Sequence, residues 1–269
     1  MIFRTFAAFF LRDFRQMLSY KFSFLLDIAS IVFTATTFFF VAQLFDTGAM
    51  TVIANYGGTY FPFVLVGIAF STYQSVGLNA FAQSLRQEQY VGTLESVLVT
   101  PIRVQTFLAG SALWDFLYAT FEVLIYFAVA ITAFGLMLNN ANVPAAVLSI
   151  GLTLTTFMGL GILAAAFILR FKKGNPVTWL IASTGELFGG VYFPTEILPD
   201  WMRSVSQWVP MTHALTAIRK SLLANADMAV IQDDLFFLGM CTLIIWPIGI
   251  LAFQFALRKS QEDGTLGHY

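Results

Sequence analysis

Six long apolar segments run through this chain, and they restrict what it can fold into. A helix needs about 20 consecutive apolar residues to cross the hydrocarbon core of a bilayer. The runs are continuous rather than alternating, which favours transmembrane helices over transmembrane strands. They are Phe22–Phe45, Phe61–Ala82, Gln105–Leu138, Val143–Leu169, Val177–Phe193 and Leu235–Leu257. We therefore expect an all-α membrane protein with six transmembrane helices, the fifth of them weakened by Gly189 and Gly190.

The composition excludes several other classes of protein. Hydrophobic residues make up 58% of the chain and charged residues 11%, whereas soluble domains are about 45–50% apolar and about 25% charged. The formal net charge of −1 gives no basic field for a nucleic acid partner. The single cysteine, Cys241, excludes an intrachain disulfide, and the two histidines, His213 and His268, complete no zinc-binding pattern. We expect no catalytic residues, no metal site and no cofactor in this chain.

The distribution of lysine and arginine predicts the orientation of the helices. Basic residues gather on the cytoplasmic side of membrane proteins. Eleven of the 14 lie before the first span, between spans two and three, between spans four and five, or after the sixth. The opposite side holds only Arg203, Arg219 and Lys220. We expect a multi-pass protein of the plasma membrane, the inner membrane of a bacterium, with both termini in the cytoplasm.

Residues 1–21 form a segment distinct from the six-helix domain, 22–269. On a helix, Arg4, Arg12 and Arg15 share one face, and phenylalanines such as Phe10 and Phe14 share the opposite face. This pattern is typical of an amphipathic helix that lies in the membrane interface. A signal peptide is the alternative, but Arg12-Asp13 interrupts the apolar stretch and no small-x-small cleavage site follows.

The connection between the last two spans, residues 194–233, is longer and more apolar than the usual connection in a helix bundle. Prolines at 194, 199 and 210 divide the stretch. We expect short re-entrant helices that fold back into the membrane on the external side. Irregular backbone is tolerated at that depth only where protein or a water-filled cavity covers it. An amphipathic external cap is the alternative.

The loop between spans two and three, residues 85–101, has a defined start and stop. Gly92 breaks the preceding helix, Thr93 can cap the next one, and Glu95 lies in its first turn. Leu94 begins an apolar stripe, and the helix stops before Pro101. A short amphipathic cytoplasmic helix suits docking to a partner, although its stripe could instead pack under the bundle or on lipid.

Four acidic residues lie in or near the predicted spans. They are Asp27, Asp115, Glu122 and Glu186. Ionisable groups in a membrane are costly and are candidates for function. Asp115 and Glu122 are seven residues apart, so they share one helix face with Tyr118. A hydrogen-bonded network that holds helices together is the favoured interpretation, and a proton relay is the alternative.

Two motif regions follow one another along the chain. The first is Gly92-Thr93-Leu94-Glu95 followed by Thr100-Pro101. The second is Gly189-Gly190-Val191-Tyr192-Phe193-Pro194, with Leu198-Pro199 and Pro210-Met211-Thr212-His213 further along. Together they resemble the motifs of ABC-2 type transporter permeases. Each motif alone is moderately specific, but their joint order and spacing make the match strong. The resemblance covers nearly the whole chain.

The resemblance implies the membrane subunit of an ATP-driven exporter, in which two permease chains pair with two cytoplasmic ATPase chains. ATP and Mg²⁺ are then held by the partner, in agreement with the absence of a G-x-x-x-x-G-K-[ST] loop from these 269 residues. A second copy of the chain and membrane lipid are the other partners implied. The resemblance assigns ATPase coupling to residues 85–101, with candidates Arg86, Glu88, Gly92, Thr93, Leu94, Glu95, Thr100 and Pro101. An ion- or proton-coupled secondary transporter that uses Asp115, Glu122 and Glu186 is the alternative function.

Aromatic residues are the candidates for a substrate path. They are Phe38, Phe39, Tyr60, Phe70, Tyr73, Tyr192 and Phe193. Aromatic faces suit a drug-like molecule, a lipid or a lipid-linked glycan, but for any single residue lipid contact and helix packing are the favoured explanation. Small residues permit close approach between membrane helices. We expect that role for Gly67, Gly77, Gly159 and Gly161.

Overall fold

The computed structural model describes residues 10–12, 14–15, 17, 19–44, 53, 56, 58–91, 104–138, 141–171 and 176–262. The regular structure within these residues is helical. In chain order the elements are α2 (Lys21–Leu44), α4 (Tyr60–Val91), α6 (Val104–Phe134), α7 (Val143–Phe171), α8 (Pro176–Phe188), the 3₁₀ turn η2 (Thr195–Ile197), α9 (Asp200–Ser206), α10 (Pro210–Leu223) and α11 (Met228–Glu262).

Among the residues that the structure describes, five helices are long and apolar enough to cross a membrane. Their candidate spans are Lys21–Leu44, Tyr60–Ser84, Ala112–Phe134, Val143–Phe171 and Met228–Ser260. The fifth predicted span corresponds to α8, which has 13 residues. At about 1.5 Å of rise per residue it is about 20 Å long, against a hydrocarbon core about 30 Å thick. α8 alone is therefore too short to cross the membrane.

Glycines set two of the helix ends. α6 ends at Phe134, earlier than predicted, because Gly135 has a φ of +69°. α8 likewise ends at Phe188, shortly before Gly190, whose φ is +74°. Side chains with a Cβ rarely adopt this left-handed conformation, so glycine permits the turn. α4, by contrast, continues beyond its predicted span, which ends at Ala82, and ends at Val91, directly before Gly92.

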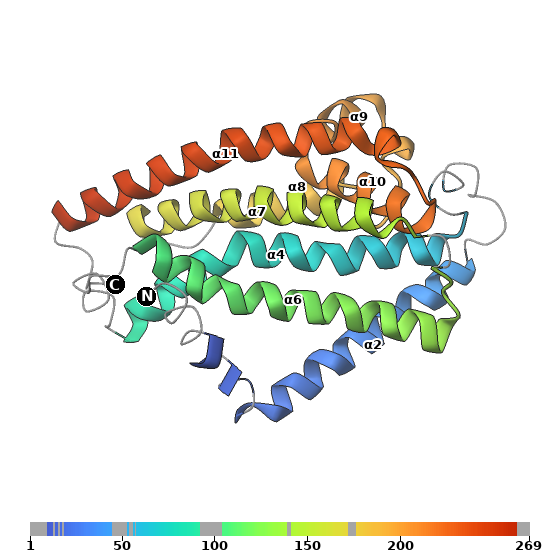
Figure 1. Ribbon diagram of the computed structural model, residues 1–269, viewed down its shortest axis with the longest axis horizontal. Coiled ribbons are helices and arrows are strands. Elements are labelled where there is room, and N and C mark those ends of the chain that lie inside the picture. The colour runs from blue at the N-terminus through green and yellow to red at the C-terminus, as the bar shows by residue number, and fades with distance from the viewer. Residues whose placement is uncertain are drawn as a thin grey trace.

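The long helices lie side by side in the order α2, α6, α4, α7 and α11 (Figure 1). α4 and α7 are the central pair: 67% and 56% of an 18-residue apolar stretch in each is buried, compared with 11% for both α2 and α11. α10 packs against α4, α7 and α11 at one end of the bundle, and α8 lies beside α4 and α10. The outer helices α2 and α11 therefore leave long apolar faces exposed.

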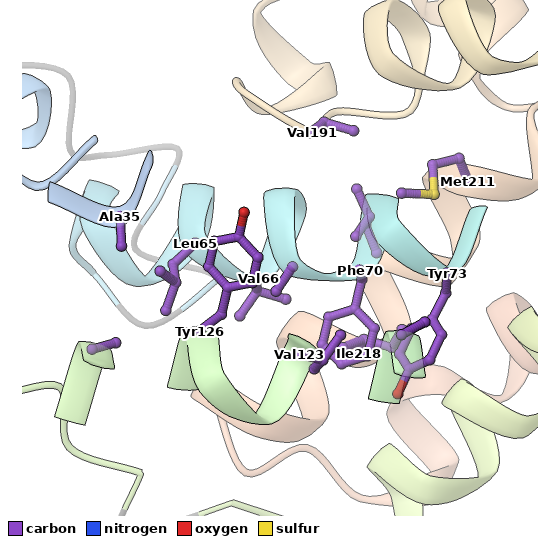
Figure 2. Packing of buried hydrophobic residues seen from close by; sticks show 14 of the residues in the cluster. Ala35, Leu65, Val66, Phe70, Tyr73, Val123, Tyr126, Val191, Met211 and Ile218 are labelled. Carbon is purple, nitrogen blue, oxygen red and sulfur yellow. The ribbon is translucent and has the colours of Figure 1, made fainter. Parts of the chain in front are cut away.

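The main core lies between α4, α6 and α10 (Figure 2). α4 contributes Phe70 and Tyr73, and α10 contributes Met211 and Ile218. Val191, from the turn after α8, is fully buried against the same cluster. The core thus fixes both α10 and this turn to α4.

Two glycines bring the backbones of α4 and α7 together. A Cβ at Gly161 would lie 1.9 Å from the carbonyl oxygen of Gly77, and one at Gly77 would lie 2.6 Å from the Cβ of Phe157. No larger residue fits either position without moving a helix. The prediction that these glycines permit close helix approach is confirmed.

The described part of the N-terminal segment contacts α6. The rings of Phe10 and Phe14 lie edge-on to Trp114, with centroids 5.4 and 5.8 Å from the indole ring. Both phenylalanines remain 36% exposed. The apolar face of this segment therefore packs only partly against the bundle, which leaves area for lipid.

Candidate functional site

A buried arginine joins three elements at the end of the bundle where α4 begins. Arg219 of α10 is 3% exposed. Its Nε donates to the carbonyl of Phe63 at 3.0 Å, Nη1 to that of Gly190 at 2.8 Å, and Nη2 to that of Val191 at 3.0 Å. The guanidinium carbon also lies 3.5 Å from the centroid of the Phe63 ring. We call these four residues the Arg219 site; it joins α10 to α4 and to the turn after α8.

The charge of Arg219 is compensated by dipoles, a ring face and nearby polar groups. Burial lowers the pKa of its guanidinium, and Tyr56, Glu196 and Tyr60 act in the opposite direction. Arginine nevertheless stays protonated at neutral pH. Three carbonyl acceptors and an aromatic face replace the water lost on burial. Removing such partners would leave a buried charge uncompensated, which costs several kcal/mol.

Two glycines make room for the Arg219 site. Gly190 adopts its left-handed φ directly before Val191, so both carbonyls in this turn can face the guanidinium. A Cβ at Gly67 of α4 would lie 2.1 Å from the carbonyl oxygen of Val191 and 2.5 Å from Nη2 of Arg219. The site therefore forms only where α4 carries no side chain at position 67.

Three of the predicted path residues meet beside the Arg219 site. The hydroxyl of Tyr60 donates to the carbonyl of Tyr192 at 2.9 Å. The ring of Phe38 from α2 stacks on the ring of Tyr192, with centroids 5.9 Å apart and planes 15° apart. Tyr192 is 37% exposed, and the neighbouring Phe193 is partly buried. This aromatic group connects the weakly packed α2 to the rest of the bundle.

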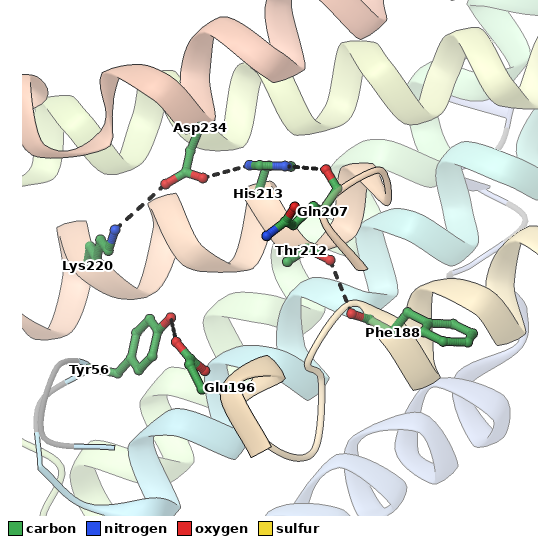
Figure 3. A network of polar contacts seen from close by, with 8 residues as sticks. All are labelled: Tyr56, Phe188, Glu196, Gln207, Thr212, His213, Lys220 and Asp234. Carbon is green, nitrogen blue, oxygen red and sulfur yellow. Dashed lines mark hydrogen bonds and ion pairs between the residues drawn. The ribbon is translucent and has the colours of Figure 1, made fainter. Parts of the chain in front are cut away.

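Tyr56 and Glu196 form a further polar contact at this end (Figure 3). Burial, and then the nearby charge of Glu196, raise the pKa of Tyr56 to about 12. The phenol is therefore neutral under ordinary conditions. It donates to Oε1 of Glu196 at 2.9 Å, which connects the segment before α4 to η2.

His213 of α10 has a partner at each ring nitrogen (Figure 3). Nδ1 lies 2.7 Å from Oδ1 of Asp234, and Nε2 lies 2.9 Å from the carbonyl oxygen of Gln207. Nζ of Lys220 lies 3.8 Å from Oδ2 of Asp234. One helical turn of α10 is thus linked both to α11 and to the residue that follows α9.

The remaining path candidates lie inside the core. Phe39 packs its ring against Phe61 and Phe134, with centroids 5.3 and 4.4 Å apart. Phe70 and Tyr73 are 1% and 3% exposed, and the Tyr73 hydroxyl donates to Thr120 at 3.0 Å. The predicted path residues therefore form two groups, one beside the Arg219 site and one in the core.

The four predicted acidic residues do not gather in one place. The hydroxyl of Tyr118 donates to Oδ2 of Asp27 at 2.7 Å, and Glu122 is within electrostatic reach of the same carboxylate. Asp115 is partly buried on α6, and Glu186 is exposed on α8. Among the described residues, no three His, Cys, Asp or Glu side chains come close enough to hold a metal ion.

Most of the predicted coupling residues lie outside the described residues. Those are Gly92, Thr93, Leu94, Glu95, Thr100 and Pro101. Arg86 is partly buried on the last turns of α4, and Glu88 follows on the same helix. The apolar span of α4 ends at Ser84, but the helix itself continues into the predicted coupling segment.

Sequence reasoning assigned no role to two buried polar residues. Arg219 was counted only as an external charge. On α10, however, it continues a buried apolar stripe at helical spacing, formed by Met211, Leu215 and Ile218. Gln74 of α4 is 2% exposed and donates to the carbonyl of Ile181 in α8 at 3.2 Å. A polar residue on the apolar face of a helix was the available signal for Arg219.

Comparison with known proteins identifies relatives of this chain. The model of a family described as "ABC-2 type transporter" matches residues 4–223. The "Probable multidrug ABC transporter permease YbhR" of Escherichia coli strain K12 is 23% identical over 155 residues, which are 57% of this chain and 41% of that protein. The "Linearmycin resistance permease protein LnrN" of Bacillus subtilis strain 168 is 24% identical over 132 residues, which are 46% of this chain and 33% of that protein. The chain thus matches less than half the length of either relative.

Proposed function

The chain belongs to the ABC-2 type transporter family, and from that premise we propose that it is the membrane subunit of an ATP-driven exporter. It moves a hydrophobic or amphiphilic molecule out of the cytoplasm: a drug-like molecule, a lipid or a lipid-linked glycan. A separate ATPase chain binds ATP and Mg²⁺ and supplies the energy. The permease itself carries out no chemical reaction.

The observation that carries this proposal is the extent of the family match. It runs from residue 4 to residue 223 and so includes both motif regions and the whole Arg219 site. Five helices long and apolar enough to cross a membrane lie in the same chain. A transport subunit accounts for both features.

The substrate class is supported by relatives and by side chains. The names of the two relatives refer to multidrug transport and to linearmycin resistance. In this chain, Phe38, Tyr60 and Tyr192 form an aromatic group at one end of the bundle, with Tyr192 partly exposed. Rings of this kind present both an apolar face and a polar hydroxyl to an amphiphilic substrate.

We place the Arg219 site on the external side and both termini in the cytoplasm. α2 begins at Lys21, and α7 ends beside Arg170, at the opposite end from the Arg219 site. α11 likewise carries Arg258 and Lys259 near its C-terminal end. Basic residues favour the cytoplasmic side. In this arrangement α8 and the turn after it make a sixth crossing, and η2, α9 and α10 form a re-entrant external unit.

Two protein partners complete the exporter. The ATPase docks on two parts of the chain. One is residues 85–101, the first of which belong to the end of α4, beyond its apolar span. The other is the N-terminal helix. A second copy of the permease packs against the outer helices, whose apolar side chains are largely exposed, as at Phe33 (74%) and Leu243 (76%). Lipid covers the remaining apolar surface.

Reconstitution distinguishes this proposal from an ion-coupled transporter. The chain co-purified with its ATPase should transport a hydrophobic dye in liposomes only with ATP, and vanadate should stop it. Transport by the isolated chain in ATP-free liposomes under an ion gradient would instead favour a secondary transporter that uses Asp115, Glu122 and Glu186. The docking segment has its own test: Leu94→Asp should abolish ATPase binding, whereas Asp200→Ala, fully exposed at the other end, should preserve it.

A further inference from the structure

Both nitrogens of the His213 ring face hydrogen-bond acceptors. Nδ1 is 2.7 Å from a carboxylate oxygen of Asp234, and Nε2 is 2.9 Å from the carbonyl oxygen of Gln207. A neutral imidazole carries one N–H and one lone pair, whereas an imidazolium carries two N–H donors. Only the imidazolium can donate in both directions at once. The positions of the two acceptors therefore favour the doubly protonated ring.

We propose that His213, Asp234 and Lys220 form a pH-dependent latch that ties α10 to α11 and to the end of α9 when His213 is protonated. When His213 loses a proton, the bond to Asp234 persists because a charged acceptor binds the remaining N–H more strongly. The Nε2 lone pair then faces the carbonyl oxygen of Gln207. Two acceptors repel, so the end of α9 is released from α10.

The surroundings of the ring favour the protonated state. The charged groups that act on it are Asp234 from α11 and Lys220 from α10 itself, and Gln207, which follows α9, contributes its carbonyl. Phe237 of α11 stacks on the imidazole with centroids 4.0 Å apart, which suits a cationic ring. Burial by itself lowers the pKa of His213, but the bonds to Asp234 and Gln207 and the charge of Asp234 outweigh burial and Lys220, so the pKa lies above 6.5.

The latch would regulate the proposed transport, and this role therefore rests on the proposed function. It lies at the end of the bundle that we place outside the cell, between the α9–α10 unit and α11. The pH of the external medium therefore sets how firmly this unit is held. We expect an acidic exterior to keep the unit closed and a neutral or alkaline exterior to loosen it.

Nitrogen-15 NMR of the histidine rings tests the latch directly. The full chain has two histidines, so the His268→Asn variant, labelled with ¹⁵N-histidine and held in detergent micelles, reports His213 alone. We expect both ring nitrogens to show imidazolium shifts at pH 6 and the titration midpoint to lie above 6.5. A ring that is neutral at pH 6 would overturn the proposal.

Two substitutions should shift this midpoint in opposite directions. Asp234→Asn removes the anion and should lower the midpoint, whereas Lys220→Gln removes the competing cation and should raise it. Both variants are compared in the His268→Asn background. A midpoint unchanged by either substitution would contradict the assigned partners.

Thermal unfolding supplies a second, independent measurement. The pKa of His213 is higher in the folded protein than in the unfolded chain, so the latch contributes fully below about pH 6.5 and is lost as the pH rises through the folded pKa. We expect the Tm to fall by about 2–4 °C across that window. The His213→Gln variant, with a neutral side chain throughout, should lack this fall, and an identical fall in the variant would exclude the latch.

These measurements use no substrate and no ATPase, so they can fail or succeed separately from the proposed function. If transport in the ATPase complex is confirmed, the external pH dependence of its rate should disappear in His213→Gln. A dependence that persists there would remove the latch from the transport cycle.

Discussion

Arg219 and Phe63 meet twice, once through the backbone and once through the ring. Nε of Arg219 donates to the carbonyl of Phe63 at 3.0 Å, while the guanidinium lies over the Phe63 ring, 3.5 Å from its centroid. Phe63 is 1% exposed and lies in the first turn of α4. The start of α4 is therefore fixed to α10 by a charge-assisted bond and a cation–π contact at a single residue.

Gly67→Ala should destabilise the protein because its Cβ would occupy space held by Arg219 and the Val191 carbonyl. Overpacking of this kind costs about 1–3 kcal/mol of unfolding free energy. Each kcal/mol lowers the Tm by about 2–4 °C in a chain of this size. The change can be measured by scanning fluorimetry of the purified protein in detergent. Gly151→Ala in α7 is the matched control, because its Cβ meets nothing within 4 Å and alanine favours a helix. Equal losses in both variants would contradict the packing explanation.

Arg219→Lys should also lower the Tm, although the charge is kept. A lysine ammonium cannot present the planar fork that reaches three carbonyls at once. Each buried carbonyl left without a donor costs about 1–3 kcal/mol. Arg203→Lys serves as the control, since its side chain is 46% exposed, and it should cause a smaller loss. A Tm unchanged by Arg219→Lys would mean that the fork is not needed.

The Phe70→Ala variant tests whether Phe70 is a core residue or lines a substrate path. Phe70 is 1% exposed, so its truncation should lower the free energy of unfolding by about 3–5 kcal/mol, which is measured as a lower Tm. Phe40→Ala, at a ring that is 60% exposed on α2, should leave the Tm nearly unchanged. A Phe70→Ala variant with normal stability but altered substrate preference would reassign Phe70 to the path.

The contact between Tyr118 and Asp27 can be tested as a structural bond against a proton relay. Tyr118→Phe removes the donor to the carboxylate and should cost about 1.5–3 kcal/mol. Asp27→Asn keeps an acceptor oxygen, so ATP-driven transport should continue at close to the normal rate. Glu186→Gln, at an exposed position on α8, should change neither stability nor transport. A tenfold loss of transport in Asp27→Asn at normal stability would favour the relay.

Hydropathy predicted the long helices well because each needs only a continuous apolar run. It does not show that the second helix continues beyond its apolar span, because the turns up to Val91 are polar, although glutamine, arginine and glutamate are good helix formers. Gly189 and Gly190 indicated that the fifth span is weak at its C-terminal end. Hydropathy alone still extended that span to Phe193, since the residues up to there are as apolar as those in a span.

The contacts of the Arg219 site could not be predicted from the sequence. Its acceptors are main-chain carbonyls, which every residue carries, and their direction depends on the turn at Gly190 and on the packing of α10 against α4. The meeting of His213 with Asp234 has the same origin, since 21 residues separate them and the reversal between α10 and α11 brings them together. Side-chain identity indicated candidates, but tertiary packing decided the partners.

The 13 residues of α8 have a consequence for the lipid around the protein. At about 20 Å the helix is about 10 Å shorter than the hydrocarbon core, and such hydrophobic mismatch is relieved by local thinning of the bilayer. Trp179 and Leu180, 69% and 60% exposed, give this helix a lipid-facing surface. If α8 forms most of the sixth crossing that we propose, the headgroups of the two leaflets should approach one another more closely beside α8 than beside the five long helices. An amphiphilic molecule would meet its thinnest barrier there.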